Sequence, residues 1–553
     1  MSTAPSHARG ATDVPLLETT IGATLEATAA RFAEREALVA VQQDIRWSWR
    51  RFDDEVNRVA RGLLAMRLAP GERVGIWAPN VAEWTLVQFA TAKLGVILVN
   101  INPAYRTHEL SYALRQSGCR TLVSARRFKT SDYVAMVDTV RGDCPELRKT
   151  VFLDDPGRPG DWQRLLDAGE RVAQREVAAR LAATRANDPI NIQYTSGTTG
   201  APKGATLSHR NILNNGYFVG RGLNYSERDR VCIPVPFYHC FGMVMGNLDC
   251  AAHGSTMVIP APAFDPEATL FAIERERCTS LYGVQTMFIA QLAHPRFAST
   301  DKTSLRTGIM AGSPCPIEVM KRCVGEFHMP EVTIMYGMTE TSPVSTQTAV
   351  DDPLDKRVGT VGRVHPHVEI RIVDPAGGEV CERGVAGEFQ TRGYSVMLGY
   401  WNDAERTAEA ITPEGWMKTG DLATMDAEGY VNIVGRIKDM IIRGGENVYP
   451  REIEEFLYTH PTIRDVQVIG VPDVKYGEEV MAVVILKEGA PPLTIEALRE
   501  FCRDKIAHYK IPRHLEIVDA FPMTVTGKIQ KFKMWEESVR RLGLEAAAAQ
   551  RHA

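Results

Sequence analysis

Hydroxyl groups, glycines and a lysine are concentrated in residues 195–204, which read TSGTTGAPKG. The glycines permit positive φ angles and let backbone N–H groups come close to a ligand. The hydroxyls are neutral hydrogen-bond donors, and Lys203 adds a fixed positive charge. Such a loop suits a triphosphate, because many N–H and O–H donors can contact the anion at once. The segment therefore predicts a phosphate site for a nucleotide.

The order of residues in this loop differs from that of a Walker-type NTPase. A Walker motif has Gly-Lys followed by Ser or Thr, whereas here Pro202 precedes Lys203 and Gly204 follows it. Residues 190–193 alternate in polarity as a strand does, and Ser208 is suited to cap a following helix. A ligand-free, solvated Gly/Thr turn is the alternative interpretation of the loop.

The composition indicates a globular protein of several domains. Of the 553 residues, 44% are hydrophobic and 24% are charged, and the net charge is −4. A single hydrophobic core stops growing near ~250–300 residues, so the chain must divide. The balanced charge gives no sign of nucleic-acid binding, which would need a clustered basic surface. The 10 cysteines are scattered without metal-ligand spacing, which favours reduced thiols and a cytoplasmic location.

Two segments are relevant to whether the protein is secreted or inserted into a membrane. Residues 1–13 lack the apolar run of a signal peptide, and we expect them to form a disordered arm. Residues 231–248 contain no Asp, Glu, Lys or Arg. Because Pro234, Pro236 and Asn247 interrupt this segment, we interpret it as a buried substrate wall rather than a membrane span. Peripheral contact with a membrane stays open, as does the oligomeric state.

Strand-like and helix-like segments alternate through the first part of the chain. The predicted helices include 20–32, 81–94 and 266–277, and the predicted strands are 73–77, 95–100, 149–153, 256–259, 279–284 and 332–336. This alternation predicts doubly wound, mainly parallel sheets. Residues 154–188 are polar and rich in alanine, and we interpret them as a surface connection.

The pattern changes towards the C-terminus. Residues 368–374 alternate at period two, which predicts an antiparallel, barrel-like subdomain. Beyond a boundary near Lys438, the predicted helices are 450–460 and 494–506 and the predicted strands 465–471 and 480–486. We therefore predict a multi-domain α/β fold. A large N-terminal domain, residues 14–437, would hold the doubly wound and barrel-like subdomains, and residues 438–553 would form a small, mobile α+β C-terminal domain.

Five further elements join the phosphate loop. They are Pro236-Phe237-Tyr238-His239, Ala311-Gly312-Ser313-Pro314, Tyr336-Gly337-Met338-Thr339-Glu340, Thr419-Gly420-Asp421 with Arg436, and Thr526-Gly527-Lys528. Each alone is a common turn or strand end. In this order, over residues 20–539, they resemble the adenylate-forming enzymes, which include acyl-CoA synthetases, luciferases and the adenylation domains of peptide synthetases. Ala311 departs mildly from the family pattern, in which glycine is more common.

The resemblance implies a role for each element. The phosphates of ATP would contact Thr195, Ser196, Gly197, Thr198, Thr199, Gly200 and Lys203; the adenine would contact Gly312, Ser313, Pro314, Tyr336 and Gly337; and the ribose would contact Asp421 and Arg436. Thr339 would contact phosphate, and Glu340 with Thr195 would hold Mg²⁺, a hard cation that prefers oxygen ligands. His239 would stand between the carboxylate site and the acyl pocket.

The resemblance also implies two chemical steps. A carboxylate attacks the α-phosphate of ATP to give an acyl-adenylate and pyrophosphate, and the thiol of coenzyme A then displaces AMP. Both reactants of the first step are anions, so positioning and cations must supply the catalysis; here these cations would be Lys203, Lys528 and Mg²⁺. In relatives the small domain rotates between the steps about a hinge. Lys438 fits that hinge, and Gly445 would then border the pantetheine tunnel.

The acid is indicated by less specific features. Residues 415–421 and 443–450 resemble those of medium-chain and longer fatty acyl-CoA ligases, and the uncharged segment 231–248 agrees with an apolar acid. We therefore expect an ATP-dependent fatty acyl-CoA ligase. The alternatives are an adenylating enzyme for an aryl or short-chain acid, one that loads a free carrier protein, and a non-catalytic nucleotide-binding protein. The last is disfavoured by the presence of Lys203, Glu340, Asp421, Arg436 and Lys528.

Overall fold

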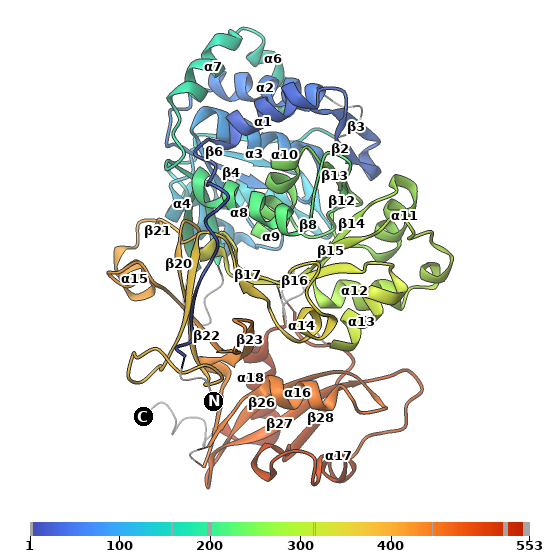
Figure 1. Cartoon of the computed structure of the whole chain (residues 1–553). Helices are drawn as coiled ribbons and strands as arrows, with labels where there is room; N and C mark the ends of the chain where they lie inside the picture. Colours follow the sequence, from blue (N-terminus) through green and yellow to red (C-terminus); the bar gives the residue numbers. More distant parts are fainter. Residues whose placement is uncertain are drawn as a thin grey trace. The chain divides into compact units, whose positions relative to one another are not determined.

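The computed structural model describes residues 4–155, 157, 159–195, 202–312, 315, 317–444, 446–523 and 529–545 (Figure 1). The chain divides into two compact units. The large unit comprises residues 8–370 and 391–418, and the small unit comprises residues 1–7, 371–390 and 419–553.

The large unit contains two mainly parallel sheets. Their strand orders are β21-β11-β10-β5-β4-β6-β9 and β18-β17-β16-β15-β14-β12-β13-β2-β3. The strands of the first sheet are β4 Arg73–Trp77, β5 Ile97–Asn100, β6 Thr121–Ser124, β9 Lys149–Phe152, β10 Pro189–Thr195, β11 Lys203–Ser208 and β21 Gly399–Tyr400. Those of the second are β2 Glu36–Ala40, β3 Ile45–Ser48, β12 Arg230–Cys232, β13 Thr256–Ile259, β14 Ser280–Gly283, β15 Thr307–Ala311, β16 Glu331–Gly337, β17 Val344–Gln347 and β18 Arg363–Val364. Parallel pairing runs through β10, β5, β4, β6 and β9 and through β2 and β12 to β16, which confirms the predicted doubly wound architecture.

Helices connect these strands. They are α1 Ile21–Arg31, α2 Trp49–Ala65, α3 Ala82–Leu94, α4 Thr107–Ser117, α5 Tyr133–Val140, α6 Asp161–Gly169, α7 Gln174–Ala183, α8 His209–Gly222, α9 Cys240–Gly242, α10 Asp249–His253, α11 Pro266–Glu276, α12 Gln285–Leu292, α13 Ile317–Glu326, α14 Leu354–Gly359 and α15 Ala404–Ala410. The predicted helix 81–94 is α3. It ends at Gly95, whose φ of +64° turns the chain into β5. A glycine adopts this left-handed conformation without the strain of a side chain.

The segment 154–188, which we interpreted as a surface connection, contains α6 and α7, so that prediction is wrong. Trp162, Leu165 and Leu166 of α6 are buried. Their spacing of three and four residues places them on one face of the helix. This face packs against α2, and α1, α2, α6 and α7 lie together at the top of Figure 1. Because the segment is polar overall, its composition did not indicate the row of apolar residues on this face of α6.

The small unit holds most of one sheet and all of another. The first has the order β1-β19-β20-β22-β23, with β1 His7–Arg9, β19 Val368–Val373, β20 Gly387–Gly393, β22 Met417–Met425 and β23 Val431–Arg436. It lies where we predicted the barrel-like subdomain. The second contains β24 Ile441–Arg443, β25 Glu446–Val448, β26 Ile463–Asp473, β27 Gly477–Leu486 and β28 His514–Ile517, with the helices α16 Pro450–Leu457, α17 Ile495–Cys502 and α18 Lys531–Leu542.

Residues 4–13, for which we predicted a disordered arm, are ordered in the structure. Ser6 is fully buried, its N–H donates to the carbonyl of Cys381, and its carbonyl accepts from the N–H of Ile372. Further along, Gly10 lies so close to the chain that an added Cβ would stand 1.9 Å from the carbonyl oxygen of His365. The prediction of disorder is therefore wrong for this stretch, because backbone pairing holds it rather than a pattern of apolar side chains.

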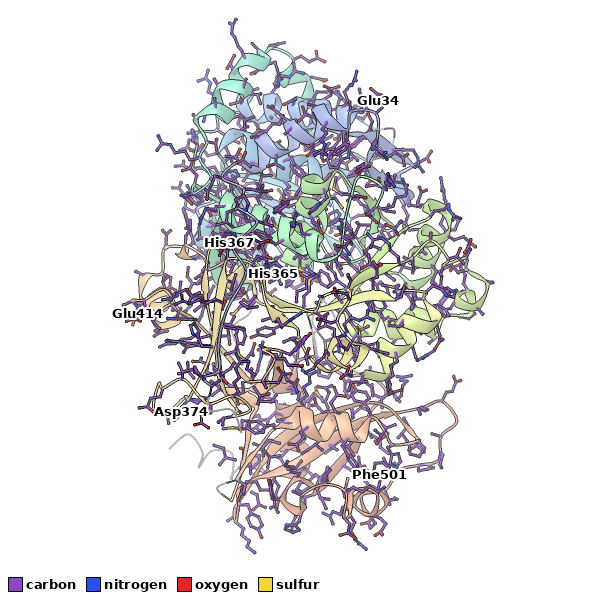
Figure 2. All side chains as sticks on the ribbon, viewed as in Figure 1. Glu34, His365, His367, Asp374, Glu414 and Phe501 are labelled. Atoms are coloured by element: carbon purple, nitrogen blue, oxygen red, sulfur yellow. The ribbon has the colours of Figure 1, made fainter. Side chains whose placement is uncertain are left out.

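Two buried histidines in the large unit make stability dependent on pH. His209 Nδ1 accepts the N–H of Ile21 at 3.2 Å, and His365, labelled in Figure 2, lies 3.0 Å through Nε2 from Gln347 Oε1. Burial lowers the pKa of each imidazole to about 3. The unfolded chain therefore binds more protons than the folded chain between the ordinary pKa of about 6.5 and about 3.

We predict that stability is complete with respect to these groups above pH ~6.5 and falls as the pH drops below it, by up to about 1.4 kcal/mol per pH unit for each histidine. Thermal melting at pH 7 and pH 5 measures this loss. His209→Asn and His365→Gln, which keep a hydrogen-bonding group but cannot titrate, should each reduce it. The control is His108→Gln, at an exposed position of α4. An unchanged pH dependence in both buried variants would contradict the assignment.

Candidate functional site

The predicted phosphate loop leaves the first sheet at the end of β10 and returns as β11. In this antiparallel pair, Thr195 stands opposite Lys203. Lys203 Nζ lies 5.0 Å from the ring centroid of Tyr400, on the neighbouring strand β21. The remaining predicted loop residues, Ser196, Gly197, Thr198, Thr199 and Gly200, lie outside the described residues. The hairpin thus places one hydroxyl and one ammonium group at the base of the loop.

Glu340 lies at the centre of the described part of this site. It follows β16 on a short 3₁₀ turn, Thr339–Thr341, and is 5% exposed. Its Oε1 accepts hydrogen bonds from Tyr400 Oη at 2.9 Å and from Thr195 Oγ1 at 3.2 Å. Burial, together with the adjacent Glu340 charge, raises the pKa of the Tyr400 phenol well above its usual range, so Tyr400 remains a proton donor.

This carboxylate suits a hard divalent cation. Among the described residues, no group of three or more His, Cys, Asp and Glu side chains that could hold a metal ion is found. Magnesium is commonly held by one or two carboxylates together with phosphate and water oxygens. Glu340, with the Thr195 hydroxyl beside it, provides such a set in part. The residue types therefore fit the predicted ion.

The predicted adenine residues follow two adjacent parallel strands. Ala311 at the end of β15 pairs with Met335 of β16. Gly312 follows with a φ of +82°. On β16, Tyr336 is half-buried, and an added Cβ on Gly337 would lie 1.7 Å from the carbonyl oxygen of Pro343. Carboxyl ends of parallel strands meet at one edge of a sheet, where α/β folds bind ligands. Ser313 and Pro314 lie outside the described residues.

His239 comes directly before α9. Its Nδ1 accepts the N–H of Phe241 at 3.1 Å, so the proton of the neutral ring is on Nε2. Cys240 connects this segment to the nucleotide side, since its Sγ lies 3.9 Å from Thr339 Oγ1. Burial raises the pKa of the Cys240 thiol to about 12, which keeps the thiol protonated.

Two asparagines from neighbouring strand ends hold the segment that precedes His239. Asn80 donates to the carbonyl of Val235 at 2.8 Å and accepts from the N–H of Phe237 at 2.8 Å. Asn100, the last residue of β5, donates to the carbonyl of Tyr238 at 3.0 Å. Sequence analysis missed both, because an asparagine at a strand end usually indicates only a turn.

Buried amides extend this contact to β10. Asn191 Nδ2 donates to Asn100 Oδ1 at 2.9 Å, and Gln193 Nε2 donates to Asn191 Oδ1 at 2.9 Å. Asn100 and Gln193 also contact the sulfur of Met243, at 3.1 and 3.2 Å. Met243 begins a π-helix, Met243–Leu248. The strand that carries Thr195 is therefore linked to the His239 segment by side chains.

The predicted ribose residues belong to the small unit. Asp421 of β22 pairs with Arg436 of β23, and Arg436 Nε lies 3.1 Å from Asp421 Oδ1. Lys438 follows in a 3₁₀ turn, Ile437–Asp439. Gly445 and Lys528 lie outside the described residues.

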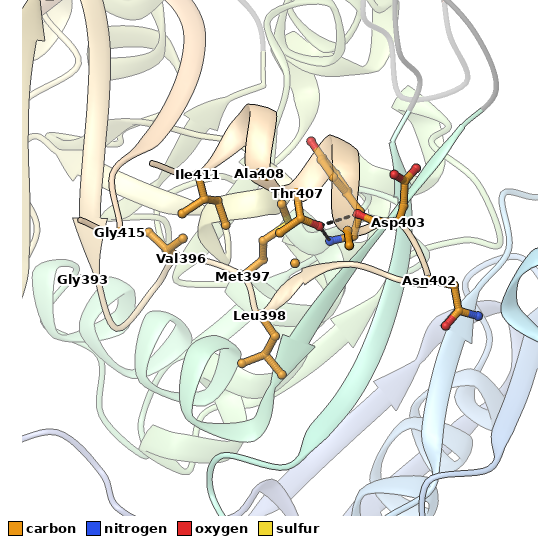
Figure 3. A pocket seen from close by; sticks show the side chains of 13 residues that line it. Gly393, Val396, Met397, Leu398, Asn402, Asp403, Thr407, Ala408, Ile411 and Gly415 are labelled. Atoms are coloured by element: carbon orange, nitrogen blue, oxygen red, sulfur yellow. Dashed lines mark hydrogen bonds between the residues drawn. The ribbon is translucent and has the colours of Figure 1, made fainter. Parts of the chain in front are cut away.

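A pocket of about 830 Å³ lies in the large unit beside Tyr400 (Figure 3). Its wall includes Val396, Leu398 and Ile411, and Thr407 Oγ1 fixes its shape by accepting the N–H of Tyr400 at 2.9 Å and donating to the carbonyl of Asp403 at 2.7 Å. Of the predicted site residues that the structure describes, none lines this pocket. Tyr400 thus lines this pocket and also donates a hydrogen bond to Glu340. Sequence analysis did not identify Tyr400.

Comparison with known proteins defines the class of protein. Residues 25–401 match the model of the AMP-binding enzyme family, and residues 452–528 match that of the AMP-binding enzyme C-terminal domain. The chain belongs to the AMP-binding enzyme family.

Individual relatives match over nearly the whole length. The medium-chain acyl-CoA ligase ACSF2, mitochondrial, of Danio rerio is 46% identical and is aligned over 98% of this chain and 91% of its own. The putative acyl-CoA synthetase YngI of Bacillus subtilis strain 168 is 45% identical over 96% of this chain and 99% of its own. The crystal structure of ATP-bound MatB from Rhodopseudomonas palustris is 30% identical, with a TM-score of 0.82, over 94% of this chain and 99% of that chain. None of the helices described in this chain is long and apolar enough to cross a membrane.

We predict that Asn100→Ala destabilises the large unit. The variant would remove two hydrogen bonds, from Asn100 Nδ2 to the carbonyl of Tyr238 and from Asn191 Nδ2 to Asn100 Oδ1, and each such bond contributes about 0.5–1.5 kcal/mol. Urea unfolding followed by tryptophan fluorescence measures the loss. The control is Asn432→Ala, at an exposed position of β23. Equal stability of the two variants would show that the amide chain does not hold the His239 segment.

Proposed function

We propose that the protein activates an unbranched fatty acid of medium length or longer. It is an ATP-dependent, AMP-forming acid–CoA ligase. The carboxylate oxygen bonds to the α-phosphorus of ATP as pyrophosphate leaves; the CoA thiol, losing its proton, then bonds to the acyl carbon as AMP leaves. ATP, Mg²⁺ and coenzyme A are its cofactors and co-substrates. The observation that carries this proposal is the near full-length similarity to enzymes named acyl-CoA ligases.

Each described residue at the predicted nucleotide-binding part of the site has a proposed role. When bound, Mg²⁺ would neutralise phosphate charge and polarise the α-phosphate. Glu340 and Thr195 would hold it, and Tyr400 and Thr195 keep the Glu340 carboxylate oriented through their hydrogen bonds. Lys203 would supply a second positive charge to the phosphates. The half-buried ring of Tyr336 would lie against the adenine, and Thr339 would contact phosphate.

The acid would lie along residues 231–248. Within this segment Phe237, Phe241, Met243 and Met245 are at most 5% exposed, and no residue is charged. An amino acid carries a second charged group besides its carboxylate. Against such a wall this second charge would be buried without a partner, which is costly in free energy. His239, held in one tautomer, would separate the carboxylate from the chain. These features favour an apolar acid over an amino acid.

In the small unit we propose that Asp421 and Arg436 bind the ribose. Their ion pair orients the carboxylate, and a carboxylate that accepts two vicinal hydroxyls is common in nucleotide sites. We also retain the proposals that residues 438–553 form a mobile domain with its hinge at Lys438, that Gly445 borders the pantetheine tunnel, and that the protein acts in the cytoplasm. No disulfide joins the ten cysteines, all of which lie in the described part of the chain, and this supports that location.

We predict that activity rises steeply with the length of an unbranched acid until the pocket is filled. Each buried methylene contributes about 0.8 kcal/mol, or about fourfold in kcat/KM. Acid- and CoA-dependent release of AMP, measured with straight-chain, branched and aryl acids, tests this expectation. A preference for acetate or benzoate would replace the proposal with a short-chain or aryl acid ligase, and activity with an acyl carrier protein but not with CoA would replace it with a carrier-loading enzyme.

We further predict that Lys528 serves adenylation alone. Lys528→Ala should slow acyl-adenylate formation by about 10²–10³-fold, the typical cost of losing one preorganised electrostatic group. Conversion of synthetic acyl-adenylate and CoA to the thioester should stay near the native rate. Lys533→Ala, at an exposed position of α18, is the control. If both half-reactions of Lys528→Ala fall equally, Lys528 has a shared or structural role.

A further inference from the structure

The part of β22 that carries Asp421 has an unusual backbone contact. Gly420, the preceding residue, has a φ of +70°. Its N–H donates to Glu388 Oε1 at 3.2 Å. A backbone N–H that donates to a carboxylate forms a charge-assisted hydrogen bond, which is stronger than one between neutral groups. Glu388 therefore holds the residue next to the proposed ribose ligand.

Glu388 is itself fixed from its other side. Its Oε2 accepts from Gln390 Nε2 at 2.8 Å. The amide oxygen of Gln390 accepts in turn from two nitrogens of Arg371, at 3.0 and 2.8 Å. Among the described residues, no lysine or arginine pairs directly with Glu388. The Glu388 carboxylate is thus held by hydrogen bonds from the Gly420 N–H and the Gln390 amide, and not by a direct ion pair with a described lysine or arginine.

A second contact holds the same part of β22. Thr419 Oγ1 donates to the carbonyl of Phe389 at 2.6 Å and accepts the N–H of Asp421 at 3.1 Å. Glu388 and Phe389 are consecutive residues of β20, the neighbour of β22 in the sheet. Two adjacent residues of β20 therefore fix Gly420 directly and Asp421 through Thr419, while Arg436 fixes the Asp421 carboxylate from β23.

We propose that Glu388 is a positioning residue for ribose recognition. Through the N–H of Gly420 it holds this part of β22 so that the carboxylate of Asp421 meets the ribose hydroxyls of ATP in one orientation. The inference rests on the ribose role of Asp421 given under the proposed function. Glu388 itself does not touch the nucleotide; it sets how much binding energy the enzyme draws from the ribose hydroxyls.

The test compares ATP with 2′-deoxy-ATP and 3′-deoxy-ATP. For each nucleotide, kcat/KM is measured by pyrophosphate release with a saturating fatty acid and CoA. In the parent enzyme, loss of a hydroxyl bound by a carboxylate costs about 1.5–3 kcal/mol, or roughly 10–100-fold in kcat/KM for at least one deoxy analogue. In Glu388→Ala, kcat/KM for ATP should fall by about tenfold while that for the same analogue stays nearly unchanged, so the preference for ATP shrinks towards one.

Three variants make the result interpretable. Glu379→Ala, at an exposed position of the same chain segment, should keep the parent preference. Glu388→Gln retains an acceptor for Gly420, so its preference should lie between those of the parent and Glu388→Ala; it serves the same test should Glu388→Ala not fold. Asp421→Ala should lose the preference.

Equal losses for ATP and both deoxy analogues in Glu388→Ala would overturn the inference, because they would indicate a structural role only. Loss of the preference in Asp421→Ala but not in Glu388→Ala would refute the inference and leave the proposed function intact. If Asp421→Ala retains the preference, the ribose assignment itself fails, and the inference fails with it.

Discussion

A buried carboxylate constrains the arrangement of the large unit. Glu340 is almost inaccessible to solvent, and two hydroxyls satisfy one of its oxygens. An ionised carboxylate in such a place is costly unless hydrogen bonds or a cation compensate it. Thr195 and Tyr400 belong to the first sheet, whereas Glu340 follows β16 of the second. The two sheets must therefore meet at this point with ångström accuracy, and the strand ends that would bind the nucleotide meet with them.

The side-chain amides that join β10 to the His239 segment extend this arrangement towards the acid. Each amide both donates and accepts, so Asn100 and Asn191 can satisfy one another and the neighbouring carbonyls in a dry interior. An apolar contact at the same place would tolerate sliding, but a hydrogen-bonded chain has one register. The proposed phosphate site and the proposed acid wall are thus both attached to β10, the first through Thr195 and the second through Asn191 and Gln193.

The sequence predicted correctly those features of the fold that depend on local patterns of residues. The alternation of strands and helices predicted the doubly wound, mainly parallel architecture, and the predicted helix 81–94 corresponds to α3. The prediction was wrong for the apolar face of α6, whose Trp162 and Leu165 lie in a polar segment. It was also wrong at Ser6, where backbone hydrogen bonds order the chain.

For the site, the motifs identified Thr195, Lys203, Glu340, His239, Asp421 and Arg436 as candidates. The predicted boundary at Lys438 assigned all six to the N-terminal domain, whereas the structure has Asp421 and Arg436 in the small unit. The motifs could not reveal Tyr400, Asn100 or Glu388. These residues act through partners 60, 91 and 32 positions away in the chain, and no local spacing reports such contacts.

The π-helix Met243–Leu248 has a consequence for how this protein family can diverge. A π turn contains one residue more than the α turn it replaces. Deletion of one residue here can therefore be absorbed by conversion to an α-helix, without breaking the strands on either side. Because the π turn absorbs the deletion, the residues after it keep their orientation, and only the side chains within residues 243–248 are rearranged along the proposed acid wall. The wall that we propose for the acid thus contains an extra residue, through which substrate preference can change while both sheets keep their register.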